Sequence, residues 1–167
     1  MKDANHALDI LGRKLGLASL GFDDQGLVGL SLAEGVTFHL TRIDDAELEV
    51  STPIQCLDFP DAALLRAMVE GHYLGAAVGA GRLAVDPDSD RVILCERWVI
   101  ADMEAPVLER RFEDFAANAV FLMSEGGEAL LERAETIRLE NLPAGGDFAP
   151  DDMQENEDGD PPIVMRL

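Results

Sequence analysis

Residues 36–51 read VTFHLTRIDDAELEVS, and this stretch decides the fold class of the chain. Apolar and polar residues alternate from Val36 to Thr41, which is the pattern of a strand with one buried face. The turn-forming run IDDA follows and leads into a second short strand signal, Glu47–Ser51. A third signal, Leu27–Leu32, lies just upstream. Because short connections join antiparallel neighbours, these segments predict an antiparallel meander, which can leave one face open.

Helices and two further strands are expected around the meander. A first helix should run from Ala4 to Leu15, with Asp3 as its N-cap and Gly16 just past its end. A second helix should begin near Pro60, since proline is tolerated in a first turn. The remaining signals are strands at Val78–Val85 and Arg91–Ile100, a strong amphipathic helix at Glu104–Met123, and a weaker helix at Glu128–Leu139. Runs of antiparallel strands between helices predict an α+β fold.

The 167 residues are expected to form one domain over residues 1–139 and an acidic, flexible tail over residues 140–167. The tail holds eight acidic residues, one arginine and four prolines, a composition typical of disorder. It ends in an apolar patch made by Ile163, Val164, Met165 and Leu167. An acidic tether with an apolar tip fits either a short docking segment or a disordered end without a role.

The net charge of the chain limits the classes of partner that it can bind. Thirty-three acidic residues oppose thirteen basic ones, giving a formal net charge of −20. Binding to a nucleic-acid backbone needs a basic surface, so this composition argues against it. Anionic membranes are disfavoured for the same reason. A basic or neutral protein partner stays open, because a negative field can steer it in, although acidity can also serve solubility alone.

Cysteine usage and the N-terminus predict a cytoplasmic protein. Cys56 and Cys95 form no CxxC pair and sit among apolar neighbours, so both are expected to be buried, reduced thiols. The N-terminal run is too polar for a signal peptide. No apolar run approaches the ~20 residues that a membrane helix needs.

Sequence motifs that match known catalytic or ligand-binding sites lack the neighbouring elements or residues that those sites need. GAGRLA (79–84) fits the dinucleotide pattern, but a helix precedes it and a strand follows, the reverse of what that site needs. DPDSD (86–90) has calcium-loop spacing, but Arg91 and Arg97 stand where the loop needs glycine and glutamate. The histidines lie in different elements and pair with no cysteine or carboxylate at ligand spacing. The sequence therefore predicts no catalytic residue, no metal, no cofactor and no enzymatic activity.

Two parts of the sequence resemble one known family. The first is the pattern Leu8, Leu11-Gly12, Leu15-Gly16-Leu17, Leu20, Phe22-Asp23 and Gly26. The second is GAGRLAVDPDSDRVILCERWVI, followed by an acidic amphipathic helix with Phe112 and Phe115. Together they are similar to the type III secretion chaperones that escort effector proteins, the class I or Tir-chaperone-like group. The resemblance covers about Leu8 to Met123.

This resemblance implies a bacterial, cytoplasmic homodimer of α+β protomers without catalytic activity. Members of the family bind the N-terminal segment of an effector in an extended form and keep it soluble and competent for secretion. Some members instead hold a regulator of the secretion genes, so the alternative function is to sequester a transcriptional regulator or anti-activator of those genes. A small enzyme or ligand-binding domain is the remaining alternative.

The chain departs from the family pattern at two places. The family's common L-P-L after the last strand is here Trp98-Val99-Ile100, which puts local details of that surface in doubt. The acidic tail is also longer than the usual end of the family. It is a candidate contact for a regulator or the secretion ATPase, or a segment that occupies the client groove when no client is present.

Two sets of site residues are expected. An extended client needs a long apolar surface or an exposed sheet edge, and the N-terminal region offers apolar side chains for it. The expected effector-binding set is Leu8, Leu11, Leu15, Phe22, Leu30, Phe38 and Leu40, although core packing competes for each of them. The expected dimer interface, which rests mainly on the resemblance, is Leu65, Met68, His72, Val78, Gly79 and Gly81.

Overall fold

The structure is a computed structural model that describes residues 3–17, 19–32, 35–73 and 78–142. Its order of elements is that of an α+β protein, as the sequence predicts. The chain runs through α1 (Ala4–Lys14), β1 (Leu27–Ser31), β2 (Thr37–Arg42), β3 (Glu47–Pro53), the short 3-10 helix η1 (Gln55–Leu57), α2 (Ala62–Gly71), β4 (Arg82–Val85), β5 (Val92–Val99), α3 (Ala105–Leu122) and α4 (Glu125–Glu140).

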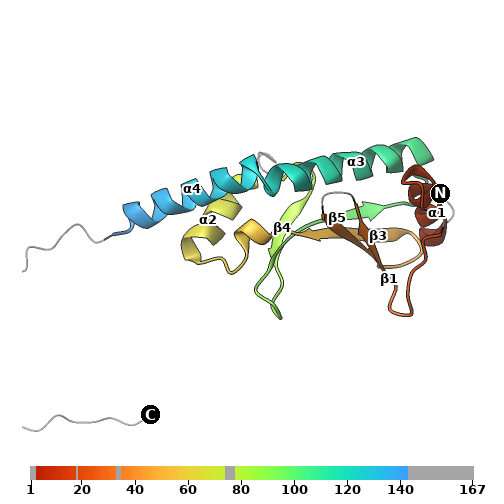
Figure 1. Ribbon diagram of the computed structural model, residues 1–167, viewed down its shortest axis with the longest axis horizontal. Coiled ribbons are helices and arrows are strands. Elements are labelled where there is room, and N and C mark those ends of the chain that lie inside the picture. Colours follow the sequence, from red (N-terminus) through yellow and green to blue (C-terminus); the bar gives the residue numbers. More distant parts are fainter. Residues whose placement is uncertain (1–2, 18, 33–34, 74–77, 143–167) are drawn as a thin grey trace, which may run out of the picture.

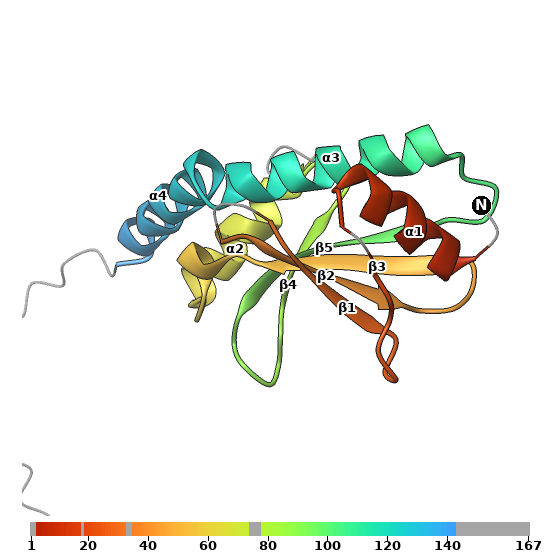
Figure 2. The same ribbon diagram turned by 45° about the vertical axis from the view of Figure 1, so that its right-hand side comes forward.

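The strands form one antiparallel sheet in the order β1-β2-β3-β5-β4. The predicted meander is confirmed as β1, β2 and β3, and the predicted hairpin as β4 and β5. α3 runs along one face of the sheet, with α1 beside it (Figures 1 and 2). α2 and α4 lie against each other at the far end. The order of the strands leaves β1 and β4 at the two edges.

The core forms between the sheet and α3. Phe38 of β2 and Trp98 of β5 are both buried, at 1% and 0% exposure, and both point toward this helix. Phe112 and Phe115 of α3 pack edge-to-face on them, with ring centroids 5.6 to 6.4 Å apart. Such aromatic contacts add to the burial of apolar area that stabilises the fold.

Local signals explain where two of the helices begin. The carboxylate of Asp3 accepts a hydrogen bond from the amide of His6 at 2.9 Å and caps α1. Asp61 caps α2 in the same way, accepting from the amide of Leu64 at 2.8 Å. Both caps satisfy amides that a helix start leaves without an intrahelical partner.

The structure corrects the start of one strand. The sequence pattern placed a strand from Val78 to Val85, but β4 begins only at Arg82. Gly79 has a positive φ of 55°, and Gly81 donates its N–H to the carbonyl of Val78 at 2.9 Å, so this segment turns before the strand starts. Turn hydrogen bonds here replace the ladder that apolar alternation suggested.

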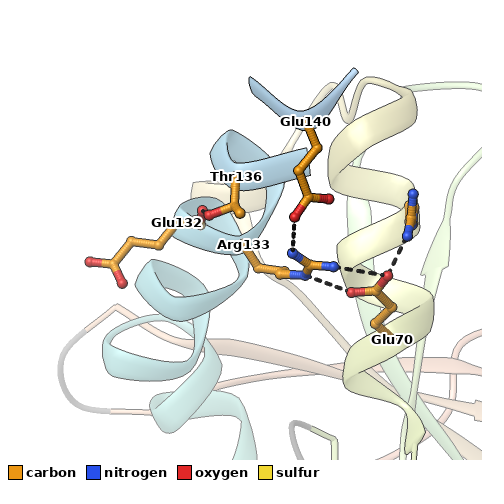
Figure 3. A network of polar contacts seen from close by, with 6 residues as sticks. Glu70, Glu132, Arg133, Thr136 and Glu140 are labelled. Carbon is orange, nitrogen blue, oxygen red and sulfur yellow. Dashed lines mark hydrogen bonds and ion pairs between the residues drawn. The ribbon is translucent and has the colours of Figure 1, made fainter. Parts of the chain in front are cut away.

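α4 is longer than its sequence pattern indicates. Its buried face against α2 is made by Leu130, Ala134 and Ile137. Charged side chains flank this contact: Arg133 bonds to Glu70 of α2 at 2.7 Å and also approaches Glu140 at 3.6 Å (Figure 3). The predicted tail falls almost entirely outside the described residues, so its flexibility stays a prediction.

Candidate partner-binding surfaces

Among the residues that the structure describes, the outer edge of β1 carries main-chain groups without a hydrogen-bond partner. Leu32 donates to the carbonyl of Val36 at 3.0 Å and Arg42 to that of Gly26 at 2.8 Å, which fixes the phase of the β1–β2 ladder. Bonded and non-bonded pairs alternate in an antiparallel ladder. Gly29 and Ser31 therefore direct their N–H and C=O groups away from β2, toward the open edge.

A turn closes one end of this edge. The amide of Asp23 donates to the carbonyl of Leu27 at 2.9 Å, and the amide of Leu27 donates to the carboxylate of Asp23 at the same distance. The outward main-chain groups of Leu27 are thus satisfied within the protomer. A strand that joins the sheet here can pair with Gly29 and Ser31 but meets the Asp23 turn at the other end.

Exposed apolar side chains and a hollow occur on β1, on α1 and on the segment that joins them. Gly29 is exposed, and a Cβ atom added to it would approach only the imidazole Cδ2 of His39, at 4.0 Å. Leu27 is 36% exposed and Leu17, after α1, is 41% exposed. A hollow of about 350 Å³ lies beside α1 and is lined by His6, Leu8, Asp9, Gly12, Arg13, Leu17, Ser19 and Leu20.

Most of the expected effector-binding residues lie inside the protomer. Leu15 and Phe22 are half-buried and pack against the core. The other five are at most 2% exposed: Leu8, Leu11, Leu30, Phe38 and Leu40. In this structure these five hold α1, β1 and β2 together, and a direct role in client binding stays a prediction.

The second surface is an apolar stripe that begins on α2 and extends just past its end. Leu65, Val69 and Tyr73 follow each other at helical spacing and are 41%, 73% and 75% exposed; we call them the α2 stripe. Phe59, just before the helix, is equally open at 73%. Exposed large side chains gathered in one place mark an interaction site more often than single ones do.

The charges beside the α2 stripe are paired. Arg66 bonds to Glu70 at 2.9 Å, and Glu70 in turn accepts from Arg133. Asp61 accepts from Arg138 at 2.8 Å, and this hydrogen bond with the bond from the amide of Leu64 holds the pKa of Asp61 at about 2. Hydrogen bonds from Arg133 and Arg66 likewise lower the pKa of Glu70.

His72 connects α2 to the β4 edge of the sheet. Its Nδ1 lies 2.7 Å from the carbonyl of Met68, and its Nε2 accepts from the amide of Leu83 at 2.9 Å. These partners require a neutral ring with the proton on Nδ1. The side chain thus satisfies an outward amide of β4 that would otherwise be open to a partner strand.

The expected dimer residues are divided between surface and interior. Leu65 and Gly79 are exposed, and His72 and Gly81 are half-buried. Met68 and Val78 are buried at 4% and 2%. A Cβ atom on Gly81 would lie 2.9 Å from a methyl group of Leu94, so the close approach that this glycine allows is to its own chain. Their role at a dimer interface stays a prediction.

Sequence reasoning missed a buried ion pair between the sheet and α3. Glu96 of β5 is 6% exposed and accepts from Arg111 of α3 at 2.7 Å. The pair borders a groove of about 660 Å³ that also involves Asn118 and Gly79. Its sequence signal was available, since Glu96 alternates with Leu94 and Trp98 on the inward face of a strand.

Neither a metal-ligand group nor a membrane-spanning helix occurs among the described residues. None of their His, Cys, Asp and Glu side chains form a group of three or more that could hold a metal ion. In the same part of the chain no helix is long and apolar enough to cross a membrane. Cys95 is buried as expected, whereas Cys56 is exposed, which corrects that expectation.

Comparisons with known proteins show which sequences and solved structures this chain resembles. The sequence model of the Tir chaperone protein (CesT) family matches residues 6–123. The Yersinia pestis type III secretion chaperone SycH, solved in complex with a stable fragment of YscM2, has 21% identity and a TM-score of 0.55 over 71% of this chain and 98% of that chain. A comparison with curated proteins finds no match.

Two other solved structures have similar folds. The ExsC–ExsE complex contains a chain with 20% identity and a TM-score of 0.53, over 84% of this chain and 93% of that chain. The HopA1–SchA chaperone–effector complex gives 19% identity and a TM-score of 0.55, over 74% of this chain and 91% of that chain. At these identities the likeness shows the shared fold.

Proposed function

This chain belongs to the Tir chaperone protein (CesT) family, the chaperones of type III secretion, and we propose that it holds the N-terminal segment of a secreted effector in extended form. The observation that carries this proposal is the open edge of β1. Within the described residues, Gly29 and Ser31 present main-chain groups there without a partner, and both residues are exposed. A segment without structure of its own can satisfy those groups by adding a strand to the sheet.

Apolar surface beside the edge supplies the second source of affinity. Ordering a client chain has a large entropic cost, so hydrogen bonds alone give little net binding. Side chains that alternate along an added strand can bury themselves near Leu27 and in the hollow beside Leu17. Each Å² of apolar area removed from water contributes roughly 25 cal/mol. Buried side chains support this surface from inside the protomer: those of Leu8, Leu11, Leu30 and Leu40. Two half-buried residues, Leu15 and Phe22, form its border.

The functional unit is a homodimer in the bacterial cytoplasm without enzymatic activity. Two copies provide a longer track for an extended client than one protomer does. The α2 stripe and Leu65 in particular offer the apolar surface for self-association. The acidic tail after Glu140 is a candidate contact for a regulator or the secretion ATPase.

Identification of the bound polypeptide tests the proposal. The full chain is used to isolate its partner from the native bacterium, and the partner is identified by mass spectrometry. Limited proteolysis and hydrogen exchange are then measured on the purified complex. We expect a secreted protein whose N-terminal segment is protected only in the complex, together with new protection of the Gly29 and Ser31 amides. A compact client, or a bound regulator with β1 unprotected, contradicts the proposal.

A further inference from the structure

A hollow of about 630 Å³ opens at the end of the sheet where β1 ends and β2 begins. Part of its lining is apolar and comes from Val36, Pro53 and Met123. The exposed thiol of Cys56 also lines it, so we call it the Cys56 hollow. Because these side chains come from three separate segments of the chain, the hollow forms only when the protein folds.

The lining of the Cys56 hollow differs in charge from the chain as a whole. None of its described lining residues is acidic, although the chain has thirty-three acidic residues. Arg91 and His39 contribute a guanidinium and an imidazole. Arg91 approaches the carboxylate of Asp58 only at 4.0 Å, so its guanidinium can bond to a further carboxylate. The hollow therefore fits a segment that combines acidic and apolar side chains.

The chain itself contains a segment of this chemistry. Residues 158–167 read DGDPPIVMRL, so the carboxylates of Asp158 and Asp160 precede a run of apolar side chains. The apolar run can cover the apolar part of the hollow, and each Å² removed from water contributes roughly 25 cal/mol. Either carboxylate can form a charge-assisted hydrogen bond with the guanidinium of Arg91.

The position of α4 brings this segment within reach of the Cys56 hollow. Met123 lies just before α4, and the thiol of Cys56 donates to the carbonyl of Leu122 at 3.4 Å, so the hollow adjoins the start of this helix. α4 has 16 residues and leads away from the sheet over about 24 Å (Figure 1). Residues 141–162 join its end to the apolar run, and a flexible chain of about 20 residues spans roughly 25 Å. A linker whose length matches the span gives a tethered segment its highest effective concentration.

We propose that residues 158–167 dock in the Cys56 hollow of their own chain and cover the end of β1 until a client displaces them. Ser31 of β1 pairs with Thr37, which lines the hollow. A docked segment therefore lies where a client strand on β1 would continue past Ser31, and the Asp23 turn closes the other end of that edge. Displacement by a client rests on the proposed function, whereas docking rests only on the hollow and the segment.

The rate at which Cys56 reacts with a maleimide tests the docking. The full chain is purified without a client, and the wild type is compared with the double variant Ile163→Ser and Val164→Ser. The two serines remove apolar area and keep every charge. At an effective concentration of about 1 mM, a contact with a dissociation constant of about 0.1 mM is formed in about 90% of molecules. We therefore expect Cys56 to react about tenfold faster in the double variant.

A second pair of substitutions in the same tail is the matched control. Phe148→Ser with Met153→Ser also removes two apolar side chains, but outside the docking segment, and should leave the Cys56 rate unchanged. Cys95 is 5% exposed and should react slowly in all three proteins. A synthetic peptide with the sequence DGDPPIVMRL should restore the slow Cys56 rate when it is added to the double variant.

The outcomes separate docking from displacement. Equal Cys56 rates in the wild type and the double variant overturn the docking, as does a faster rate in the matched control or a parallel rise at Cys95. Protection of Cys56 that is lost on dilution shows that a second copy occupies the hollow, and this also overturns the proposal. These measurements involve no client, so they stand even if β1 is found unprotected in the complex. A bound client that leaves Cys56 protected by the segment overturns displacement alone.

Discussion

Nε of Arg111 lies 2.7 Å from Oε1 of Glu96, and this ion pair joins α3 to the inner face of β5. The carboxylate is almost fully buried, whereas about a third of the arginine side chain is exposed. The guanidinium also lies over the ring of Trp98, 5.9 Å from its centroid. The pair therefore sits where the aromatic core meets solvent.

Loss of one partner of this pair should destabilise the protomer strongly. Arg111→Met leaves the Glu96 carboxylate buried without a counter-charge, and we expect a loss of about 3 kcal/mol in the free energy of unfolding. The double variant Glu96→Leu with Arg111→Met should recover most of it, because it removes both charges. Urea denaturation of the wild type, the two single variants and the double variant measures the coupling free energy between Glu96 and Arg111. Additive effects in the double variant would show that the pair is not coupled.

Asp61 should make stability depend on pH in the acid range. Its pKa is held at about 2 in the folded protein, below its ordinary value of 3.8, mainly by the hydrogen bond from Arg138. A carboxylate whose pKa is lower in the folded state than in the unfolded state stabilises the fold fully at pH values above the unfolded pKa. This stabilisation is lost as the pH falls through the folded pKa. Asp61→Asn keeps an N-cap but removes the charge. We expect its melting temperature to lie below that of the wild type at pH 6 and to converge with it near pH 2.

Two neighbouring glycines should respond differently to alanine. A Cβ atom on Gly127 would collide with the carbonyl oxygen of Leu122 and come within 2.7 Å of the sulfur of Cys56. On Gly126 it would meet only the ring of Phe121, which is partly exposed and can move. We expect Gly127→Ala to cost about 2 kcal/mol and Gly126→Ala less, because alanine favours a helix. Equal costs from chemical denaturation would contradict this account of the α3–α4 junction.

Removal of the His72 side chain should open the β4 edge. His72→Ala leaves the amide of Leu83 without its acceptor, and we expect a cost of about 1–2 kcal/mol. Hydrogen exchange at the Leu83 amide measures the effect directly, since this proton should exchange faster in the variant. An unchanged exchange rate would mean that the imidazole does not protect the strand edge.

Much of the fold could be predicted from the sequence because its signals are local. Alternation in β2 and the helical spacing of Leu108, Phe112 and Phe115 specify which face of each element is apolar. The weak α4 is an exception, since much of its stability comes from packing on α2. Tertiary contacts of this kind lengthen a helix without a matching sequence pattern.

The surfaces could not be predicted in the same way. An apolar periodicity shows that Leu8 and Leu11 lie on one face, but not whether another element covers that face, and here both are fully buried. Phe59 has a positive φ of 56°, and its amide donates to the carbonyl of Asp90, which is distant in sequence. Such features arise only when the elements are assembled, so no local pattern in the sequence predicts them.

A proline at position 29 should separate client binding from folding. Gly29 lies on the edge strand with its N–H directed outward, where proline removes no hydrogen bond of the sheet. Gly29→Pro should therefore keep the circular dichroism spectrum of the wild type while an added client strand loses its donor and meets the ring. Gly29→Ala is the control: its Cβ makes only an ordinary contact with the His39 ring, at 4.0 Å, and its N–H is kept. We expect proteolytic protection of the client with alanine and its loss with proline; protection by both variants would show that the client does not bind by adding a strand to β1.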